Sequence, residues 1–255
     1  MYYEVNGEGY PLVMIMGGGG NLDWWNPHMI EELSKNFKVV TFDNRGTGRT
    51  DLSDKEFSIK LFADDTVGLM SALGISQANI LGWSMGGFIA QELALNYPER
   101  VKKLILYSTG CGGVKSVPRS QEAAAMLKRA SAGGMSTEEA VRMYIQPFLT
   151  SEFIDYNPDF VELIIQRMLK APTSPEVRMR QTGAIMSFDS YDRLPRIKAP
   201  TLILSGKRDI TCPPENGSIL AKAIPNARLV FFENSAHLLA EEMEEMLKVV
   251  TQFLL

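Results

Sequence analysis

The chain has 255 residues, of which 45% are hydrophobic and 22% are charged, and its net charge is -4. This balance is typical of a folded globular protein with a sizeable core, and it excludes a disordered or fibrous chain. The mild acidity, without a run of basic residues, gives no electrostatic reason to expect binding to nucleic acid or to an anionic membrane.

The amino-terminal segment and the cysteines bear on compartment and metal chemistry. Residues 1–20, MYYEVNGEGYPLVMIMGGGG, lack the basic region and the long apolar run of a signal peptide or membrane span. We therefore expect a cytoplasmic protein with no membrane partner. Cys111 and Cys212 are too few for a disulfide framework or a zinc site, so reduced thiols are expected, with no metal and no cofactor.

Short apolar runs alternate with helical patterns along most of the chain. Strands are predicted in the runs PLVMIM, FKVVTFD, ANILGW, VKKLILYST, APTLILSG and ARLVFFE. Helices are predicted in DWWNPHMIEELSKN, IKLFADDTVGLMSALG, GGFIAQELALNY, PENGSILAKAI and LLAEEMEEMLKVVTQFLL. Strands that alternate with helices of about ten to fifteen residues indicate βαβ units. We predict an α/β fold with a mostly parallel, doubly wound sheet.

The alternation breaks between residues 112 and 195. This segment has helical periodicity and no convincing strand, and Gly133-Gly134 and several prolines divide it into short helices. We predict a core formed by residues 1–111 and 196–255, with residues 112–195 inserted as a helical cap. Six of the 14 methionines lie in this cap, where they either line an adaptable pocket or pack the cap onto the core.

The stretch ILGWSMGGF contains a candidate nucleophile, Ser84. A strand must turn into a helix near Met85 within very few residues, which forces strained backbone angles at the tip of the turn. Gly82 and Gly86, two residues to either side of the serine, would relieve the clash between the strand and the helix. We expect this sharp turn to hold the hydroxyl clear of the sheet edge.

A serine hydroxyl needs a base to act as a nucleophile near neutral pH, and histidine is the usual one. The chain has two histidines. His28 begins an amphipathic helix, where a surface or packing role is expected. His237 lies in a loop after an apolar strand, from which it can reach over the sheet edge toward Ser84. His237 is therefore the candidate base.

The imidazole in turn needs a carboxylate that fixes its tautomer and stabilises its cation. Asp209 lies a few residues beyond the strand in TLILSGKRDITCPPE. Asp189 and Asp192 are alternatives, but they lie at the exit of the predicted cap. We predict Asp209 as the acid.

The glycine run IMGGGGNLDWW follows the first predicted parallel strand. Backbone N–H groups stabilise the oxyanion of acyl transfer, and we expect one donor at Met85 and one in this loop. A phosphate-binding loop would need a Gly-Lys-Ser or Gly-Lys-Thr, and the run matches the dinucleotide fingerprint poorly. Nucleotide binding is therefore not expected.

These segments together resemble the α/β-hydrolase superfamily over nearly the whole chain. GWSMGG resembles its nucleophile elbow, TFDNRGTGRTD the segment after its first helix, and LILSGKRDITCPPENG and NSAHLLAEE its acid and histidine segments. The order Ser84, Asp209, His237 is that of the family. The likeness is closest to small esterases, lactonases and perhydrolase-like members with a helical cap. The short amino terminus implies that one opening strand is abbreviated or missing.

One loop departs from the family pattern. Many members carry His-Gly in the oxyanion loop, whereas this chain has Met16-Gly17. By position the resemblance implies Gly18 as the donor, with the register open from Gly17 to Gly19.

The resemblance implies a serine hydrolase that acts on a small carboxylic ester, thioester or lactone. Ser84 stands where haloalkane dehalogenases carry aspartate and dienelactone hydrolases carry cysteine, so neither of these two activities is expected. Trp24 and Trp83 flank the expected oxyanion site, and they either wall an acyl pocket or pack in the core. The same residues would also serve an acyltransferase, a lyase or a perhydrolase. They would equally be present in a ligand-binding protein whose catalytic turnover is low. The oligomeric state is left open.

Overall fold

The computed structural model describes residues 1–132 and 134–255. The predicted breaker Gly133 lies outside the described residues. The strands are β1 (Tyr3–Asn6), β2 (Tyr10–Ile15), β3 (Phe37–Phe42), β4 (Ala78–Trp83), β5 (Val101–Tyr107), β6 (Thr201–Gly206) and β7 (Arg228–Phe232).

The described helices are α1 (Pro27–Ser34), α2 (Ile59–Ala72), α3 (Met85–Asn96), α4 (Gln121–Ser131), α5 (Thr137–Ile145), α6 (Ser151–Tyr156), α7 (Pro158–Leu169), α8 (Pro175–Met186), α9 (Glu215–Ala223) and α10 (Met243–Leu254). The short 3-10 helices are η1 (Leu22–Trp24), η2 (Pro98–Arg100), η3 (Gly113–Lys115), η4 (Gln146–Phe148), η5 (Tyr191–Arg196) and η6 (Ala240–Glu242). None of the described helices combines the length and apolar character that crossing a membrane requires.

The strands form one sheet in the order β1-β3-β2-β4-β5-β6-β7. Only β1 is antiparallel to its neighbour, so a single short antiparallel strand precedes the parallel ones. Every residue of β4 and β6 is buried, as expected where helices cover both faces of a parallel sheet. Helices α2, α3 and α9 cover one face, and α1 and α10 cover the other. The predicted doubly wound α/β fold is confirmed.

The sheet register brings three loops together. Ile15 of β2 pairs with Gly82 of β4, and Gly82 pairs with Leu106 of β5. The loops that follow these strands therefore leave the sheet side by side at its carboxyl edge. Residues far apart in sequence can meet there, which is where open α/β sheets bind their ligands.

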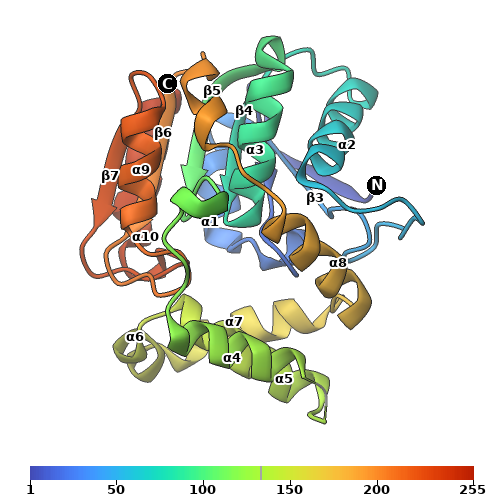
Figure 1. Ribbon diagram of the computed structural model, residues 1–255, viewed down its shortest axis with the longest axis vertical. Coiled ribbons are helices and arrows are strands. Elements are labelled where there is room, and N and C mark those ends of the chain that lie inside the picture. Colours follow the sequence, from blue (N-terminus) through green and yellow to red (C-terminus); the bar gives the residue numbers. More distant parts are fainter. Residues whose placement is uncertain (133) are drawn as a thin grey trace.

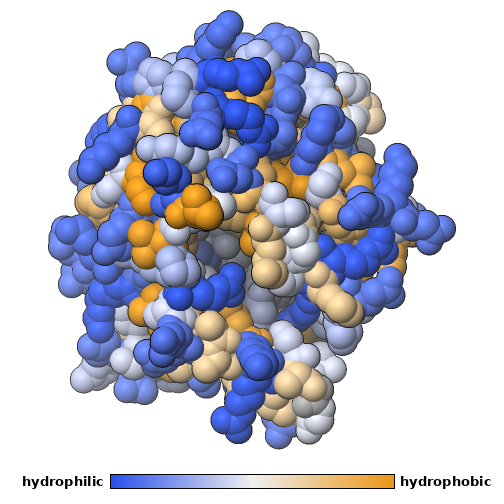
Figure 2. Space-filling view, in the orientation of Figure 1, coloured by the Kyte–Doolittle hydropathy of each residue, from blue (hydrophilic) through white to orange (hydrophobic). Residues whose placement is uncertain are grey.

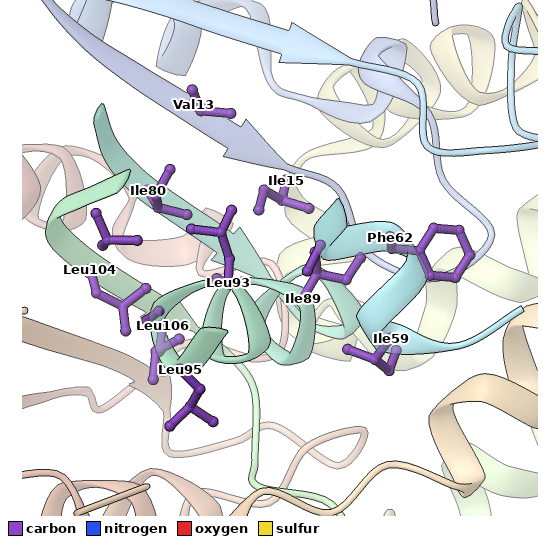
Figure 3. Packing of buried hydrophobic residues seen from close by; sticks show 14 of the residues in the cluster. Val13, Ile15, Ile59, Phe62, Ile80, Ile89, Leu93, Leu95, Leu104 and Leu106 are labelled. Carbon is purple, nitrogen blue, oxygen red and sulfur yellow. The ribbon is translucent and has the colours of Figure 1, made fainter. Parts of the chain in front are cut away.

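Helix α3 is fixed to the sheet by apolar packing. Ile89 and Leu93 of α3 pack among Ile15, Ile80 and Leu106 of three neighbouring strands (Figure 3). All five side chains are fully buried, and burying each one stabilises the fold by about 1.5–3 kcal/mol. This packing holds the start of α3 in a fixed position beside the carboxyl ends of β2 and β4.

Helices α4 to α8 lie between β5 and β6 in the chain. Figure 1 shows α4 to α7 as a group beyond the carboxyl ends of the strands. Serines cap α4, α5 and α8 at their first turns, and α5 has a complete capping box between Ser136 and Glu139. Among the cap methionines Met168 is buried, whereas Met179 and Met186 are exposed. Met179 nevertheless lines a surface pocket with residues of α4, α5 and α8.

Candidate active site

Ser84 occupies the turn between β4 and α3, with φ 56° and ψ -119°. A non-glycine residue with such angles is strained, and strain of this kind persists only where the surroundings impose it. A Cβ on Gly82 would lie 2.2 Å from the carbonyl oxygen of Gly86. A Cβ on Gly86 would lie 2.0 Å from the carbonyl oxygen of Ile15. The strand and helix are thus too close for any side chain at these two glycines. The predicted tight turn is present.

Hydrogen bonds hold the strained turn. The N–H of Ser84 donates to the carbonyl oxygen of Tyr107 at 2.9 Å, and the hydroxyl of Thr109 donates to the carbonyl oxygen of Ser84 at 2.8 Å. The Thr109 side chain also fills the space beside Gly87, where a Cβ would lie 2.4 Å from its methyl carbon. The loop after β5 therefore fixes the serine backbone from one side.

The predicted base and acid are in contact. Nδ1 of His237 lies 2.7 Å from Oδ2 of Asp209, and both side chains are buried. The other carboxylate oxygen of Asp209 accepts from the N–H groups of Thr211 at 2.8 Å and Cys212 at 2.7 Å. Because both oxygens are occupied, the carboxylate is held in one orientation toward the ring. Such a partner fixes the imidazole tautomer with its proton on Nδ1.

The loop that carries His237 is held against β4 and β5. The indole N–H of Trp83 donates to the carbonyl oxygen of His237 at 3.1 Å, and the Tyr107 hydroxyl donates to that of Leu238. Burial, and then the charges of nearby carboxylates, raise the pKa of Tyr107 well above its ordinary value, so it remains a donor. The N–H of Leu238 donates to the carbonyl oxygen of Phe148 at 3.0 Å.

Aromatic rings enclose the imidazole. Its ring centroid lies 5.3 Å from that of Trp83 and 5.1 Å from that of Phe148. Trp83 directly precedes Ser84, so the histidine packs against the residue next to the candidate nucleophile. Phe148 comes from the segment predicted as the cap.

The glycine loop after β2 faces the serine turn. A Cβ on Gly17 would lie 3.1 Å from Cβ of Ser84, and one on Gly18 would lie 3.7 Å from Cβ of Met85. The N–H of Gly19 donates to Oε1 of Gln181 at 2.7 Å, so this amide already has an acceptor. Of the three glycines left open by the sequence, Gly19 is therefore the least suitable oxyanion donor.

The loop after β3, within TFDNRGTGRTD, supports the glycine loop. The Asn44 amide donates to the carbonyl oxygen of Met16 at 3.1 Å, and Asp43 accepts from the N–H of Leu22 at 2.8 Å. Burial raises the pKa of Asp43, while the N–H groups of Arg49 and Leu22 oppose the shift. These contacts tie both ends of the glycine loop to the loop after β3.

The predicted substrate contacts, Trp24 and Trp83, are both almost fully buried. Together with Trp25 and Tyr107 they line a cavity of about 20 Å³. This volume holds about one water molecule, so the two tryptophans enclose too little space for a substrate group as they stand. Trp83 instead holds the histidine loop, while its role toward a substrate stays a prediction.

His28, Asp189 and Asp192, which were not predicted as catalytic residues, form other contacts or lie on the surface. Nε2 of His28 lies 2.7 Å from Glu244 on the surface. Asp189 accepts from the N–H of Tyr191 at 3.0 Å, and Asp192 is exposed. Both cysteines are free thiols, as expected.

Sequence reasoning missed Gln181 and Phe148, which approach the glycine loop and the histidine from the segment between β5 and β6. One signal was available for Gln181. Val177, Gln181 and Ala184 are the buried residues of α8 and recur at helical spacing, so the glutamine stands in an otherwise apolar stripe. No local pattern distinguishes Phe148, because its contact with His237 spans 89 positions of the chain.

Comparison with known proteins identifies the family of this chain. The model of the family described as alpha/beta hydrolase fold matches residues 10–243. The protein RutD of Azorhizobium caulinodans, named provisionally as a carbamate hydrolase, is 30% identical over 237 residues, which cover 93% of this chain and 88% of that protein. The enol-lactonase from Burkholderia xenovorans LB400 has a TM-score of 0.84 at 28% identity, covering 99% of this chain and 95% of that chain. A thermophilic esterase from Thermogutta terrifontis has a TM-score of 0.83 at 28% identity, covering 99% and 92%.

Proposed function

The chain belongs to the alpha/beta hydrolase fold family, and we propose that it is a serine hydrolase that cleaves a carboxylic ester, thioester or lactone. The observation that carries the proposal is the buried contact of 2.7 Å between His237 and Asp209. The ring of His237 packs against Trp83, the residue that precedes the strained turn at Ser84. An isolated buried carboxylate is costly, and a histidine that it orients is a competent base.

The first half of the reaction forms an acyl-enzyme. The hydroxyl oxygen of Ser84 attacks the substrate carbonyl carbon while its proton passes to Nε2 of His237. The carboxylate of Asp209 accepts a hydrogen bond from Nδ1–H and stabilises the imidazolium. The tetrahedral oxyanion accepts hydrogen bonds from the N–H groups of Gly18 and Met85. When the intermediate collapses, the leaving alcohol or thiol takes the proton from His237.

The second half releases the acyl group. His237 takes a proton from water, the water oxygen attacks the acyl carbon, and the bond to Ser84 breaks as the serine regains its proton. The segment 112–195 acts as the cap that selects the acyl and alcohol groups, since Phe148 and Gln181 reach the site from it. Transfer to an alcohol instead of water would use the same acyl-enzyme, and product analysis with added alcohol separates the two outcomes.

The test compares Ser84→Ala with Ser187→Ala, an exposed serine whose hydroxyl donates to the carbonyl oxygens of Gly183 and Ala184 in α8. On p-nitrophenyl butyrate we expect kcat to fall by about 10⁴-fold or more in Ser84→Ala and to remain near that of the parent in Ser187→Ala. A fluorophosphonate probe should label the parent and Ser187→Ala but not Ser84→Ala. Retained turnover in folded Ser84→Ala would overturn the proposal.

A further inference from the structure

A cavity of about 350 Å³ opens beside the glycine loop. Gly18 and Gly19 line it together with residues of α4 and α8. Figure 2 shows the face on which these helices lie, hollowed where the helices beyond the strand ends meet the sheet. The volume is that of a small-molecule pocket, and the cavity begins at the proposed oxyanion donor Gly18. We call it the glycine-loop cavity.

The glycine-loop cavity is lined by positive charge. Arg119, Lys128 and Arg178 line it, and among the described residues that line it there is no carboxylate. None of the three forms an ion pair with any residue in the described ranges 1–132 and 134–255. Arg178 is half-buried, whereas Arg119 and Lys128 are exposed at the rim. Together the three charges make the cavity and its opening attractive to an anion.

Gln181 supplies a second observation that points to a ligand. Its side chain is 1% exposed and its Oε1 accepts from the N–H of Gly19, which fixes the orientation of the amide. Its Nε2 is buried and has no hydrogen-bond partner among the described residues. A buried donor without a partner costs about 1–3 kcal/mol, so an acceptor in the cavity would be favoured at this position.

Arg178 is held over the glycine loop. A Cβ on Gly19 would lie 3.9 Å from Cγ of Arg178, and the guanidinium lies 4.9 Å from the centre of the Tyr144 ring. Its Nε donates to the carbonyl oxygen of Thr173 at 3.2 Å, which leaves the terminal N–H groups available. Tyr144 itself donates to the carbonyl oxygen of Gly18 at 3.2 Å. The cation is thus oriented by its neighbours a short distance from the proposed oxyanion site.

We propose that the natural substrate is an ester, thioester or lactone that carries a carboxylate, and that the glycine-loop cavity binds this carboxylate. Arg178 and Nε2 of Gln181 donate hydrogen bonds to it, and Arg119 and Lys128 add attraction from the cavity rim. A carboxylate matches the planar fork of a guanidinium and would satisfy the buried amide. This inference rests on the proposed serine hydrolase function and names its substrate class.

The test uses two pairs of esters, in each of which one member carries a carboxylate and the other carries the methyl ester of that carboxylate, with rates corrected for spontaneous hydrolysis. Mono-p-nitrophenyl adipate places the carboxylate on the acyl side, para-carboxyphenyl acetate places it on the alcohol side, and each is compared with its methyl ester. We expect kcat/KM to favour the anionic member of one pair, and Arg178→Gln to lower that ratio by about 10- to 100-fold, because a charge-assisted hydrogen bond is lost. Lys128→Gln should lower it less, and added salt should weaken the preference in the parent.

The matched control is Arg129→Gln, which removes a charge from α4 without touching the cavity and should leave the ratio unchanged. Thermal unfolding shows whether Arg178→Gln is folded, and Lys128→Gln removes an exposed charge where folding is not at risk. An unchanged ratio in both variants, or no charge preference in the parent for either pair, would overturn this inference. If Ser84 is still required for the neutral esters, the serine hydrolase proposal survives that outcome.

Discussion

Nδ1 of His237 lies 2.7 Å from Oδ2 of Asp209, in a contact shielded from solvent. The two residues come from the loops that follow β7 and β6, which are neighbouring strands. Removing either partner would leave the other buried without its main polar contact.

Asp209→Asn should lower kcat by about 10³- to 10⁴-fold with little change in the fold. An asparagine oxygen can keep the bonds from the N–H groups of Thr211 and Cys212, which leaves its amide N–H facing Nδ1 of His237. The imidazole would then carry its proton on Nε2, the atom that must be free to accept the proton of the Ser84 hydroxyl. Turnover of p-nitrophenyl butyrate and the unfolding midpoint measure both effects.

Asp192→Asn provides the control, because Asp192 is exposed and should tolerate the change. Near-parent turnover in Asp209→Asn would show that the histidine does not need this carboxylate.

Gln181→Met should lower kcat on a neutral ester by about 10-fold, because the Gly19 amide loses its acceptor and the glycine loop is less well positioned. The effect should fall on kcat more than on KM, since the proposed oxyanion donor Gly18 lies in this loop. Gln181→Glu keeps an acceptor for the amide and should recover most of the activity on the same neutral ester. Equal activity in all three proteins would show that this contact does not position the loop.

Gly86→Ala should prevent folding or destabilise the protein severely. The added Cβ would lie 2.0 Å from the carbonyl oxygen of Ile15, which is backbone and cannot move aside without disrupting β2. Gly68→Ala is the matched control, because Gly68 is exposed in α2 and an added Cβ would meet no described atom within 4 Å beyond its chain neighbours and the backbone of its own helix. That change should stabilise the protein by about 0.5–1 kcal/mol. Soluble expression and urea unfolding distinguish the two variants.

Iodoacetamide at neutral pH should leave activity unaffected, whereas a fluorophosphonate should abolish it. Burial, and then the charge of Asp209, raise the pKa of the Cys212 thiol well above its ordinary value, and burial also raises the pKa of the Cys111 thiol. Both thiols stay protonated and are poor nucleophiles. Mass spectrometry in urea would confirm that the same cysteines react once the chain is unfolded. Rapid loss of activity with iodoacetamide would point to a role for a thiol that we do not assign.

The local sequence predicted the α/β fold and the turn at Ser84. The apolar runs of β4 and β6 are buried along their whole length, and Gly82 and Gly86 stand where backbone atoms allow no side chain. These features depend on short-range sterics and on strand periodicity, so neighbouring residues suffice to reveal them. The methionines of residues 112–195 were less informative, because apolar character alone did not separate buried Met168 from exposed Met179.

The chain order and residue types were enough to select Ser84, Asp209 and His237 as candidates, because each lies at the end of a recognisable strand. Only the folded chain decides that Asp209 rather than Asp189 contacts the histidine, that Gln181 accepts from the Gly19 amide, and that three cations line one cavity with the glycine loop. Such contacts join residues up to 162 positions apart. Their geometry is set by sheet register and helix packing, which no local pattern encodes.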